Sequence, residues 1–421
     1  MMVGQYESIT AFCFSLLCPL SYPGFVPTIF LNCFLVLLRV HHRSSMAIAD
    51  GKLVFLLLPI VVVFSLSIPT GCLSSALFVF GDSFFDPGNN NYINTITDFQ
   101  ANHWPYGQSY FSTPNGRFSD GRLIPDFIAE YAKLPPIPAY LEPSNKEYTH
   151  GANFASGGAG TLIDTYAGFV VDLHTQLRHF GDLVNHYRQN LGDTKARQML
   201  SSAVYLFSCG SNDYISPVVN NQSIYYQYTQ QQYVDMVIGN LTTVIKGIYE
   251  VGGRKFGFLN VPPLGCWPAI RLRQPGNICS KEIDDVIRLH NQALARKLEN
   301  LETHMEGFML SKLDFYTSMS NRMKNPSQYG FKEGETACCG SGPFGGVYSC
   351  GGMRRIKEYE VCDNVLEYLF FDSYHPNELA SRQFAEMFWN GDSIVTEPNS
   401  LEALFDGASS TTFLVHPNNE L

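Results

Sequence analysis

The chain has 421 residues, of which 45% are hydrophobic and 14% are aromatic, and its formal net charge is -10. This composition excludes a disordered polypeptide, because disordered chains lack the apolar residues that a core requires. The acidic balance argues against a nucleic-acid-binding protein, which needs a basic face, and against an anionic membrane as a partner.

The N-terminal region has the layout of a secretory signal peptide. Lys52 precedes an uncharged apolar run, Leu53–Ile68, and small residues follow the run. The run is short for a membrane-spanning helix, which needs about 20 residues. Because Met46 stands directly upstream, we expect residues 46–75 to be the signal peptide and residues 1–45 to be an N-terminal extension that is not native to the protein. A membrane-anchoring extension is the alternative for residues 1–45.

Residues 76–400 are predicted to form one α/β domain. Short apolar runs of the length of a buried strand recur at wide intervals, and helical patterns such as Ile283–Leu301 lie between them. The runs are Leu77–Phe80, Val204–Phe207, Phe256–Leu259, Phe308–Leu313 and Tyr368–Phe371. This alternation indicates a mainly parallel sheet that is covered by helices on both faces. In such a sheet we expect the active site at the carboxyl ends of the strands.

The glycine-rich segment Phe331–Asp363 predicts an irregular loop that disulfides hold together. Beyond the leader, the cysteines are Cys209, Cys266, Cys279, Cys338, Cys339, Cys350 and Cys362. We expect Cys209, which follows an apolar run, to be a buried free thiol and the other six to form three disulfides. Cys266 and Cys279 enclose the nearest local loop. Cys338 and Cys339 are expected to reach Cys350 and Cys362, and the sequence leaves the pairing open. A zinc site is the weaker interpretation, because paired Cys-x-x-Cys units are missing from the sequence.

Two further surface features are predicted. Asn221 and Asn240 begin Asn-x-Ser/Thr motifs, which are glycosylation acceptors if the chain is secreted. The last stretch, Ser400–Leu421, is polar and weakly patterned, so we expect residues 401–421 to be a loose C-terminal tail.

Gly81-Asp82-Ser83 follows the first apolar run and offers a serine nucleophile. Gly81 permits a tight exit from the strand, after which Ser83 is exposed at the sheet edge. A serine hydroxyl needs a neighbouring base, and Asp372–His375 supplies a histidine together with a carboxylate that can orient it. The alternative for Ser83 is a helix cap. The alternatives for His375 are a capping, core or metal-binding histidine, although no further ligand cluster stands nearby in the sequence.

Two more segments follow predicted strands. Asn153–Gly160 is a loop of small residues whose backbone amides can approach a developing oxyanion, and the amide of Asn212, in Gly210–Asp213, can donate to the same oxyanion. The alternatives are a packing turn or phosphate loop for the first segment and an Asx turn for the second. The first segment lacks both the G-x-G-x-x-G spacing and a Walker lysine, so nucleotide binding is unsupported.

Taken together and in this order, these segments resemble the sequence blocks of the plant GDSL esterase/lipases, which belong to the SGNH hydrolase superfamily. Phe78–Ser83 with Asp86–Asn90 resembles the first block, Asn153–Gly160 the second, Gly210–Asp213 the third and Asp372–His375 the fifth, and Asn115–Arg122 and Val261–Cys266 also fit plant members. The resemblance covers about residues 76–400. It implies a flavodoxin-like three-layer α/β/α sandwich.

The resemblance also implies roles for individual residues. Ser83 would be the nucleophile, His375 the general base and acid, and Asp372 the carboxylate that orients His375. The oxyanion hole would consist of the backbone amides of Ser83 and Gly158 and the side chain of Asn212. Gly157 is an alternative to Gly158, because the doubled glycine leaves the register ambiguous.

The function that the resemblance implies is a secreted carboxylic ester hydrolase, located in the apoplast or cell wall, that needs no metal or cofactor. Its partner would be a small-molecule or lipid ester, and we expect no nucleic-acid binding and no stable membrane insertion of the mature chain. One alternative is an acyltransferase that uses the same acyl-enzyme, and another is a non-catalytic secreted glycoprotein that binds lipid. His103–Tyr106 and Tyr225-Tyr226 are candidates for an acyl pocket or for ordinary packing.

Overall fold

The computed structural model describes residues 76–145, 147–220, 227–391 and 395–406. The predicted signal peptide, the predicted extension at residues 1–45, Asn221 and Tyr225-Tyr226 lie outside these ranges. Within the described ranges, no helix is both long enough and apolar enough to cross a membrane.

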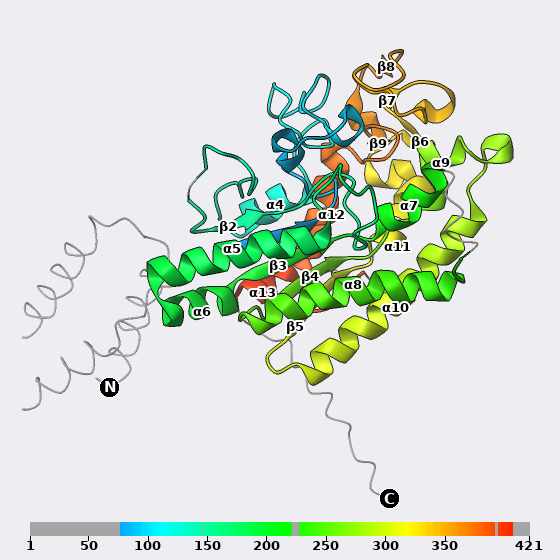
Figure 1. Ribbon diagram of the computed structural model, residues 1–421. Helices are drawn as coiled ribbons and strands as arrows, with labels where there is room; N and C mark the ends of the chain where they lie inside the picture. The colour runs from blue at the N-terminus through cyan, green and yellow to red at the C-terminus, as the bar shows by residue number, and fades with distance from the viewer. Residues whose placement is uncertain (1–75, 146, 221–226, 392–394, 407–421) are drawn as a thin grey trace, which may run out of the picture. The chain divides into compact units, whose positions relative to one another are not determined.

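A six-stranded sheet lies at the centre of the described domain, with the strand order β10-β5-β4-β3-β1-β2 (Figure 1). Its strands are β1 (Leu77–Gly81), β2 (Gly151–Asn153), β3 (Val204–Ser208), β4 (Lys255–Leu259), β5 (Met309–Leu313) and β10 (Thr396–Pro398). Neighbouring strands pair in parallel except for β10, which runs antiparallel to β5 at one edge. The order 2-1-3-4-5 of the parallel strands is that of flavodoxin-like folds, so the predicted architecture is confirmed.

Helices cover both faces of the sheet (Figure 1). One layer contains α5 (Leu173–Leu191), α6 (Asp193–Ser202), α8 (Gln230–Glu250) and α10 (Lys281–His304), and the other contains α4 (Ile124–Tyr131), α12 (Glu378–Asn390) and α13 (Leu401–Asp406). Further helices of the described residues are α7 (Ser211–Val219), α9 (Pro268–Arg271) and α11 (Phe315–Lys324). The predicted helix Ile283–Leu301 lies inside α10. The structure is therefore a three-layer α/β/α sandwich.

Aromatic side chains fix the register of the central strands. Residues two apart on a strand face the same side, and here these positions carry aromatic rings on three neighbouring strands. Two rows stack across the strands, with ring centroids between 5.0 and 5.4 Å apart: Phe78–Tyr205–Phe256 and Phe80–Phe207–Phe258. Phe180 of α5 packs edge-on against Phe78 and Phe80. Because a one-residue slip would turn both rows to the opposite face, this packing selects one alignment.

The last predicted strand does not join the central sheet. Tyr368–Phe371 contains β9 (Tyr368–Phe370), which pairs in parallel with β6 (Glu333–Ala337) in a separate two-stranded sheet. The backbone amides of Cys338 and Cys339 donate to the carbonyls of Phe370 and Phe371. The cysteine-containing loop is therefore the hydrogen-bonding partner of this strand. The expectation that Asp372–His375 follows a strand of the central sheet was therefore wrong.

The predicted C-terminal tail also begins too early. Leu401 and Leu404 of α13 are fully buried, and α13 contacts β4 and β5. Gly257 of β4 has no side chain, and a Cβ there would lie 2.8 Å from a methyl carbon of Leu401, so the glycine leaves the space that this leucine fills. The folded domain thus extends through Asp406 rather than ending at residue 400, while residues 407–421 lie outside the described ranges.

Three disulfides join the six cysteines that were expected to pair. They are Cys266–Cys279, Cys338–Cys362 and Cys339–Cys350, and Cys209 is a buried free thiol. The loop Phe331–Asp363 is less irregular than predicted, because β6 lies in it and β7 (Cys339–Gly340) pairs with β8 (Glu360–Val361).

Candidate active site

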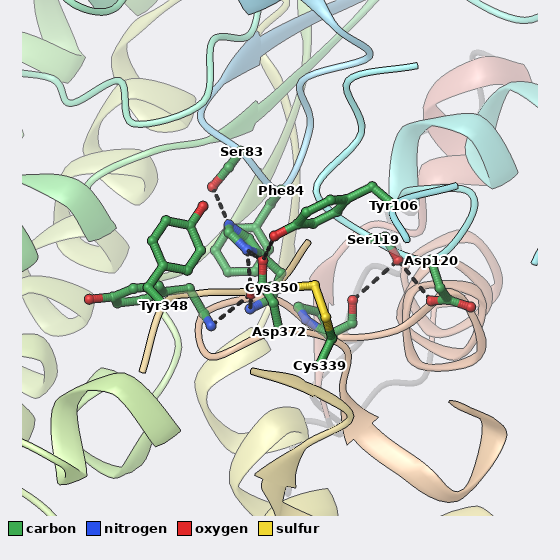
Figure 2. Close-up of polar contacts among 12 residues, drawn as sticks. Ser83, Phe84, Tyr106, Ser119, Asp120, Cys339, Tyr348, Cys350 and Asp372 are labelled. Carbon is green, nitrogen blue, oxygen red and sulfur yellow. Dashed lines mark hydrogen bonds and ion pairs between the residues drawn. A yellow bond between two sulfur atoms is a disulfide. The ribbon is translucent and has the colours of Figure 1, made fainter. Parts of the chain in front are cut away.

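Ser83, His375 and Asp372 form one continuous hydrogen-bonded chain, although Ser83 and His375 are 292 residues apart in sequence (Figure 2). The Nε2 atom of His375 lies 2.8 Å from the Oγ atom of Ser83. Its Nδ1 atom lies 2.7 Å and 2.9 Å from the two carboxylate oxygens of Asp372. Ser83 follows β1, whereas the other two residues lie between β9 and α12. The structure therefore brings together the three residues that the sequence singled out.

The backbone at Gly81 sets the direction in which Ser83 leaves β1. Gly81 has a φ of 143°, which L side chains rarely adopt, and a Cβ there would lie 2.0 Å from the carbonyl oxygen of Ser208. The buried amide of Gln176 holds Gly81 from both sides, since Oε1 accepts from its N–H at 2.9 Å and Nε2 donates to its carbonyl at 2.9 Å. Only glycine allows this close approach of β1 to the end of β3.

A cavity of about 470 Å³ opens in front of Ser83 and His375. Many of the other lining side chains are apolar or aromatic, among them Ile96, Phe99, Phe118, Tyr166, Phe169, Ile215, Val219 and Trp267, while Asp82, Asp98 and Asp164 also border the cavity. Phe84 and Phe118 also contact the His375 ring, with centroids 6.0 and 5.0 Å away. Ser83 is 8% exposed and His375 is 6% exposed. The reacting groups therefore lie in a pocket of mixed lining, in which the apolar and aromatic side chains can hold an acyl chain.

The predicted oxyanion donors line the same cavity. Ser83, Gly158 and Asn212 all border it, whereas the N–H of Gly157 already donates to Asp86 at 2.8 Å. Neither the Ser83 nor the Gly158 amide has a backbone acceptor among the described residues. The Asn212 Nδ2 atom donates one hydrogen to the carbonyl of Ala159 at 3.0 Å, which fixes the amide and leaves its second hydrogen for another acceptor.

Residues of the first sequence block hold the glycine loop in place. The two carboxylate oxygens of Asp86 accept from the amides of Gly88 and Asn89 and from the amide of Gly157. Asn89 donates to the carbonyls at both ends of the Asn153–Ala155 segment, and Asn90 donates to the carbonyl of Gly157. Burial raises the pKa of Asp86 to about 6, and these amides act in the opposite direction. Asp86–Asn90 is therefore a scaffold for the candidate oxyanion site.

The Asn115–Arg122 segment holds the stretch of chain that joins His375 to the start of α12. Asp120 accepts from the backbone N–H of Glu378 at 2.7 Å. The Ser119 hydroxyl lies 3.3 Å from the carbonyl of Pro376 and 3.2 Å from Asp120 Oδ1 (Figure 2). Arg122 forms an ion pair with Glu378 at 2.7 Å. These contacts restrain the residues that follow His375, whereas Asp372 precedes it in the sequence.

The Asp372 carboxylate is fully buried and accepts several hydrogen bonds. Oδ1 accepts from the backbone amides of Tyr374 and His375, and Oδ2 accepts from the Tyr106 hydroxyl at 2.6 Å. Burial raises the pKa of Asp372, but His375, the Arg354 guanidinium and the Tyr106 hydroxyl outweigh it and lower the pKa below its usual value. The site thus keeps this carboxylate ionised.

Sequence reasoning did not identify the contacts that Tyr106 and Arg354 make behind the site, and it did not identify the raised pKa of Asp82. His103–Tyr106 does not border the cavity, and Tyr106 instead contacts Asp372 from behind. Asp82 is fully buried next to Ser83, and burial raises its pKa to about 8, assisted by the negative charge of Asp213 and opposed by the Phe84 amide. No group of three His, Cys, Asp or Glu residues in the described ranges is suited to hold a metal ion.

Comparisons with known proteins show which proteins this chain is similar to. The pattern of the family described as GDSL-like Lipase/Acylhydrolase matches residues 77–388. The GDSL lipase of Tanacetum cinerariifolium is 68% identical over 380 residues, which cover 89% of this chain and 100% of that protein. GDSL esterase/lipase 5 and GDSL esterase/lipase 1 of Arabidopsis thaliana are 52% and 49% identical, each over 79% of this chain and over 87% and 90% of their own lengths.

Proposed function

Because the chain belongs to the GDSL-like lipase/acylhydrolase family and is a carboxylic ester hydrolase, we propose that it cleaves esters with Ser83, His375 and Asp372 through a covalent acyl-enzyme. The observation that carries this proposal is the 2.8 Å contact between the Oγ atom of Ser83 and the Nε2 atom of His375 at an apolar cavity. A serine that shares its proton with a histidine is a usable nucleophile at neutral pH.

In the acylation step, the Ser83 Oγ atom attacks the ester carbonyl carbon while its proton moves to His375 Nε2. The Asp372 carboxylate accepts from the Nδ1–H of His375 and stabilises the imidazolium that forms. The tetrahedral intermediate then collapses, its C–O bond to the alcohol breaks, and His375 returns the proton to the leaving alkoxide. The product of this step is an acyl chain that is esterified to Ser83.

In the deacylation step, water takes the position that the alcohol has left. His375 Nε2 accepts a proton from the water as its oxygen attacks the acyl carbon, and the proton is then delivered to Ser83 Oγ when the acid departs. The apolar lining from Ile96 to Trp267 suits an uncharged acyl chain, because burying a charged one there would cost its hydration.

The negative oxygen of both intermediates requires hydrogen-bond donors. We assign the backbone amides of Ser83 and Gly158 and the side-chain amide of Asn212, which border the cavity. Gly158 is preferred to Gly157, because the Gly157 amide is bound to Asp86. The bond from Asn212 to Ala159 holds the amide in advance, so little reorganisation accompanies the reaction.

Hydrolysis of p-nitrophenyl butyrate by purified protein tests the proposal. We expect Ser83→Ala to abolish turnover and also labelling by a fluorophosphonate, which reacts with activated serines. Ser201→Ala is the matched control, because Ser201 is an exposed serine on α6. Retention of most of the activity, or of the label, in Ser83→Ala would refute the assignment of the nucleophile.

We further propose that the mature protein is secreted, to the apoplast or cell wall. The three disulfides support an oxidising compartment. Of the two predicted glycosylation acceptors, Asn240 is partly exposed on α8, and its Oδ1 atom lies 2.8 Å from the ring nitrogen of His174. Peptide N-glycosidase treatment of protein from the culture medium should reduce its apparent mass, and Asn240→Gln should remove part of that change. Retention of the protein inside the producing cells would contradict this proposal.

A further inference from the structure

Arg354 is buried next to the candidate catalytic residues, yet it does not border the cavity. Arg354 is only 1% exposed to solvent. Nη2 donates to the hydroxyls of Tyr106 at 3.0 Å and of Tyr348 at 2.9 Å, and Nη1 donates to the carbonyl of Cys350 at 2.7 Å. A buried cation normally has a carboxylate partner. Here the carboxylate of Asp372 is reached through one hydroxyl group.

That hydroxyl belongs to Tyr106, which has a single proton to donate. Since Tyr106 accepts a hydrogen bond from Arg354, its own proton is directed to Asp372 Oδ2, 2.6 Å away (Figure 2). The resulting chain runs from Arg354 through Tyr106, Asp372 and His375 to Ser83. The donor–acceptor distance of each hydrogen bond in this chain is 3.0 Å or less. Tyr106 therefore donates to the carboxylate oxygen Oδ2, which also lies 2.9 Å from His375 Nδ1, and Arg354 orients the Tyr106 proton toward it.

The cysteine-containing loop delivers Arg354 to this position. Cys350, whose carbonyl accepts from Arg354, forms a disulfide with Cys339. The backbone N–H of Cys339 donates to the carbonyl of Phe371, the residue just before Asp372, at 2.7 Å. The same disulfide thus links the residue that binds Arg354 to the residue that is hydrogen-bonded to the start of the aspartate loop. Figure 2 shows this disulfide near Asp372.

We propose that Tyr106 and Arg354 are positioning residues that hold Asp372 ionised and aligned on His375, an inference that rests on the proposed function of the triad. Neither residue borders the cavity, and Tyr106 acts through Asp372. Loss of the Tyr106 hydroxyl should therefore lower kcat, while KM stays nearly unchanged. Arg354 also donates to the hydroxyl of Tyr348, which does border the cavity, so its effect on Asp372 is read from the acid limb of the pH profile.

The charges around Asp372 give the sign of a pH effect. The titratable and charged groups that face it are His375, Tyr106, Arg354, Tyr348, Tyr374 and His103. Burial and the Arg354 charge lower the pKa of His103 to about 4, so His103 is neutral under assay conditions. Removing the cation or the Tyr106 donor raises the pKa of Asp372. Proton uptake by the Asp372–His375 pair then begins at higher pH, and the acid limb of kcat/KM moves upward.

The test compares Tyr106→Phe, Arg354→Met and Arg354→Lys with the wild-type protein, using p-nitrophenyl butyrate from pH 5 to 9. We expect kcat to fall about 10- to 100-fold in Tyr106→Phe, because a bond to a charged group is lost. The acid limb should rise by about one pH unit in Tyr106→Phe and in Arg354→Met. Arg354→Lys keeps the charge but lacks the fork that reaches two hydroxyls, so its acid limb should lie nearer that of the wild type.

Tyr205→Phe is the matched control, because Tyr205 is equally buried and its hydroxyl donates to the carbonyl of Leu200, at the opposite end of β3 from the site. Its pH profile should coincide with that of the wild type. If Arg354→Met fails to fold, Tyr106→Phe and Arg354→Lys decide. An acid limb in Tyr106→Phe that superimposes on the wild type would overturn the inference. Activity in Ser83→Ala would instead overturn the proposed function.

Discussion

Replacing Gly81 with alanine should damage both the stability and the activity of the protein. The new Cβ would lie 2.0 Å from the carbonyl oxygen of Ser208, at a φ of 143°. The backbone would have to move by about 1 Å, because real Cβ atoms keep at least 3.0 Å from such an oxygen. That movement breaks the bond from Asp82 N–H to Ser208, and both bonds between Gly81 and Gln176.

The expected cost can be summed from these parts. The unfavourable backbone conformation contributes about 1–3 kcal/mol, and the three hydrogen bonds contribute about 0.5–1.5 kcal/mol each. The total of about 2.5–7.5 kcal/mol is a large part of the 5–15 kcal/mol by which folded domains are typically stable. Because Ser83 is two residues away, the same shift displaces its hydroxyl from His375, and any folded protein that remains should have lost most of its turnover.

Urea denaturation and p-nitrophenyl butyrate hydrolysis check both expectations. Gly181→Ala is the matched control, because Gly181 lies within α5 and a Cβ there meets no atom within 4 Å. This control should gain about 0.5–1 kcal/mol, since alanine favours the helix. The reasoning is refuted if Gly81→Ala unfolds within about 1 kcal/mol of the wild type, or if its kcat is unchanged.

Three further outcomes are expected. Asn212→Ala should lower kcat for p-nitrophenyl butyrate by about 10²–10³-fold, and a loss below fivefold would exclude Asn212 from the oxyanion site. Leu401→Ala should lower the free energy of unfolding by about 2–5 kcal/mol, measured in urea, and an unchanged midpoint would contradict the buried position of α13. Asp82 has a pKa raised to about 8, so the folded protein binds a proton that the unfolded chain releases near pH 4, and stability falls as pH rises between these values. Asp82→Asn should remove this contribution, at most about 1.4 kcal/mol per pH unit, and identical slopes in the two proteins would show that Asp82 does not titrate there.

The parallel strands were predictable because a strand that is buried on both faces must be apolar throughout its length. Leu77–Phe80, Val204–Phe207 and Phe256–Leu259 are such runs, and each lies in the central sheet. The edge strands were not predictable in this way. β2 consists of Gly151–Asn153 and β10 of Thr396–Pro398, and such short segments carry no periodic pattern.

Tyr368–Phe371 shows the limit of the same argument. Its apolar run identifies a buried strand correctly, but an apolar run does not specify which partner covers it. The contacts of Cys338 and Cys339 with Phe370 and Phe371 decide that this strand joins a small separate sheet. The start of the predicted tail shows the opposite case, a segment of polar composition that is nevertheless folded. Two leucines one helical turn apart, Leu401 and Leu404, are buried where α13 packs onto β4 and β5.

The sequence by itself determined the α/β class, the family, the cysteines that pair and the residues that we propose as catalytic. It could do so because strand burial and acyl transfer each permit few residue types, and these residues fall in short local segments. Only the tertiary structure decided that Tyr106 and Arg354 support Asp372, that Gly158 rather than Gly157 has its amide available, and which disulfides form. Those outcomes depend on contacts between segments up to 266 residues apart. A local sequence pattern does not specify which distant side chain will be the hydrogen-bond partner of a given group.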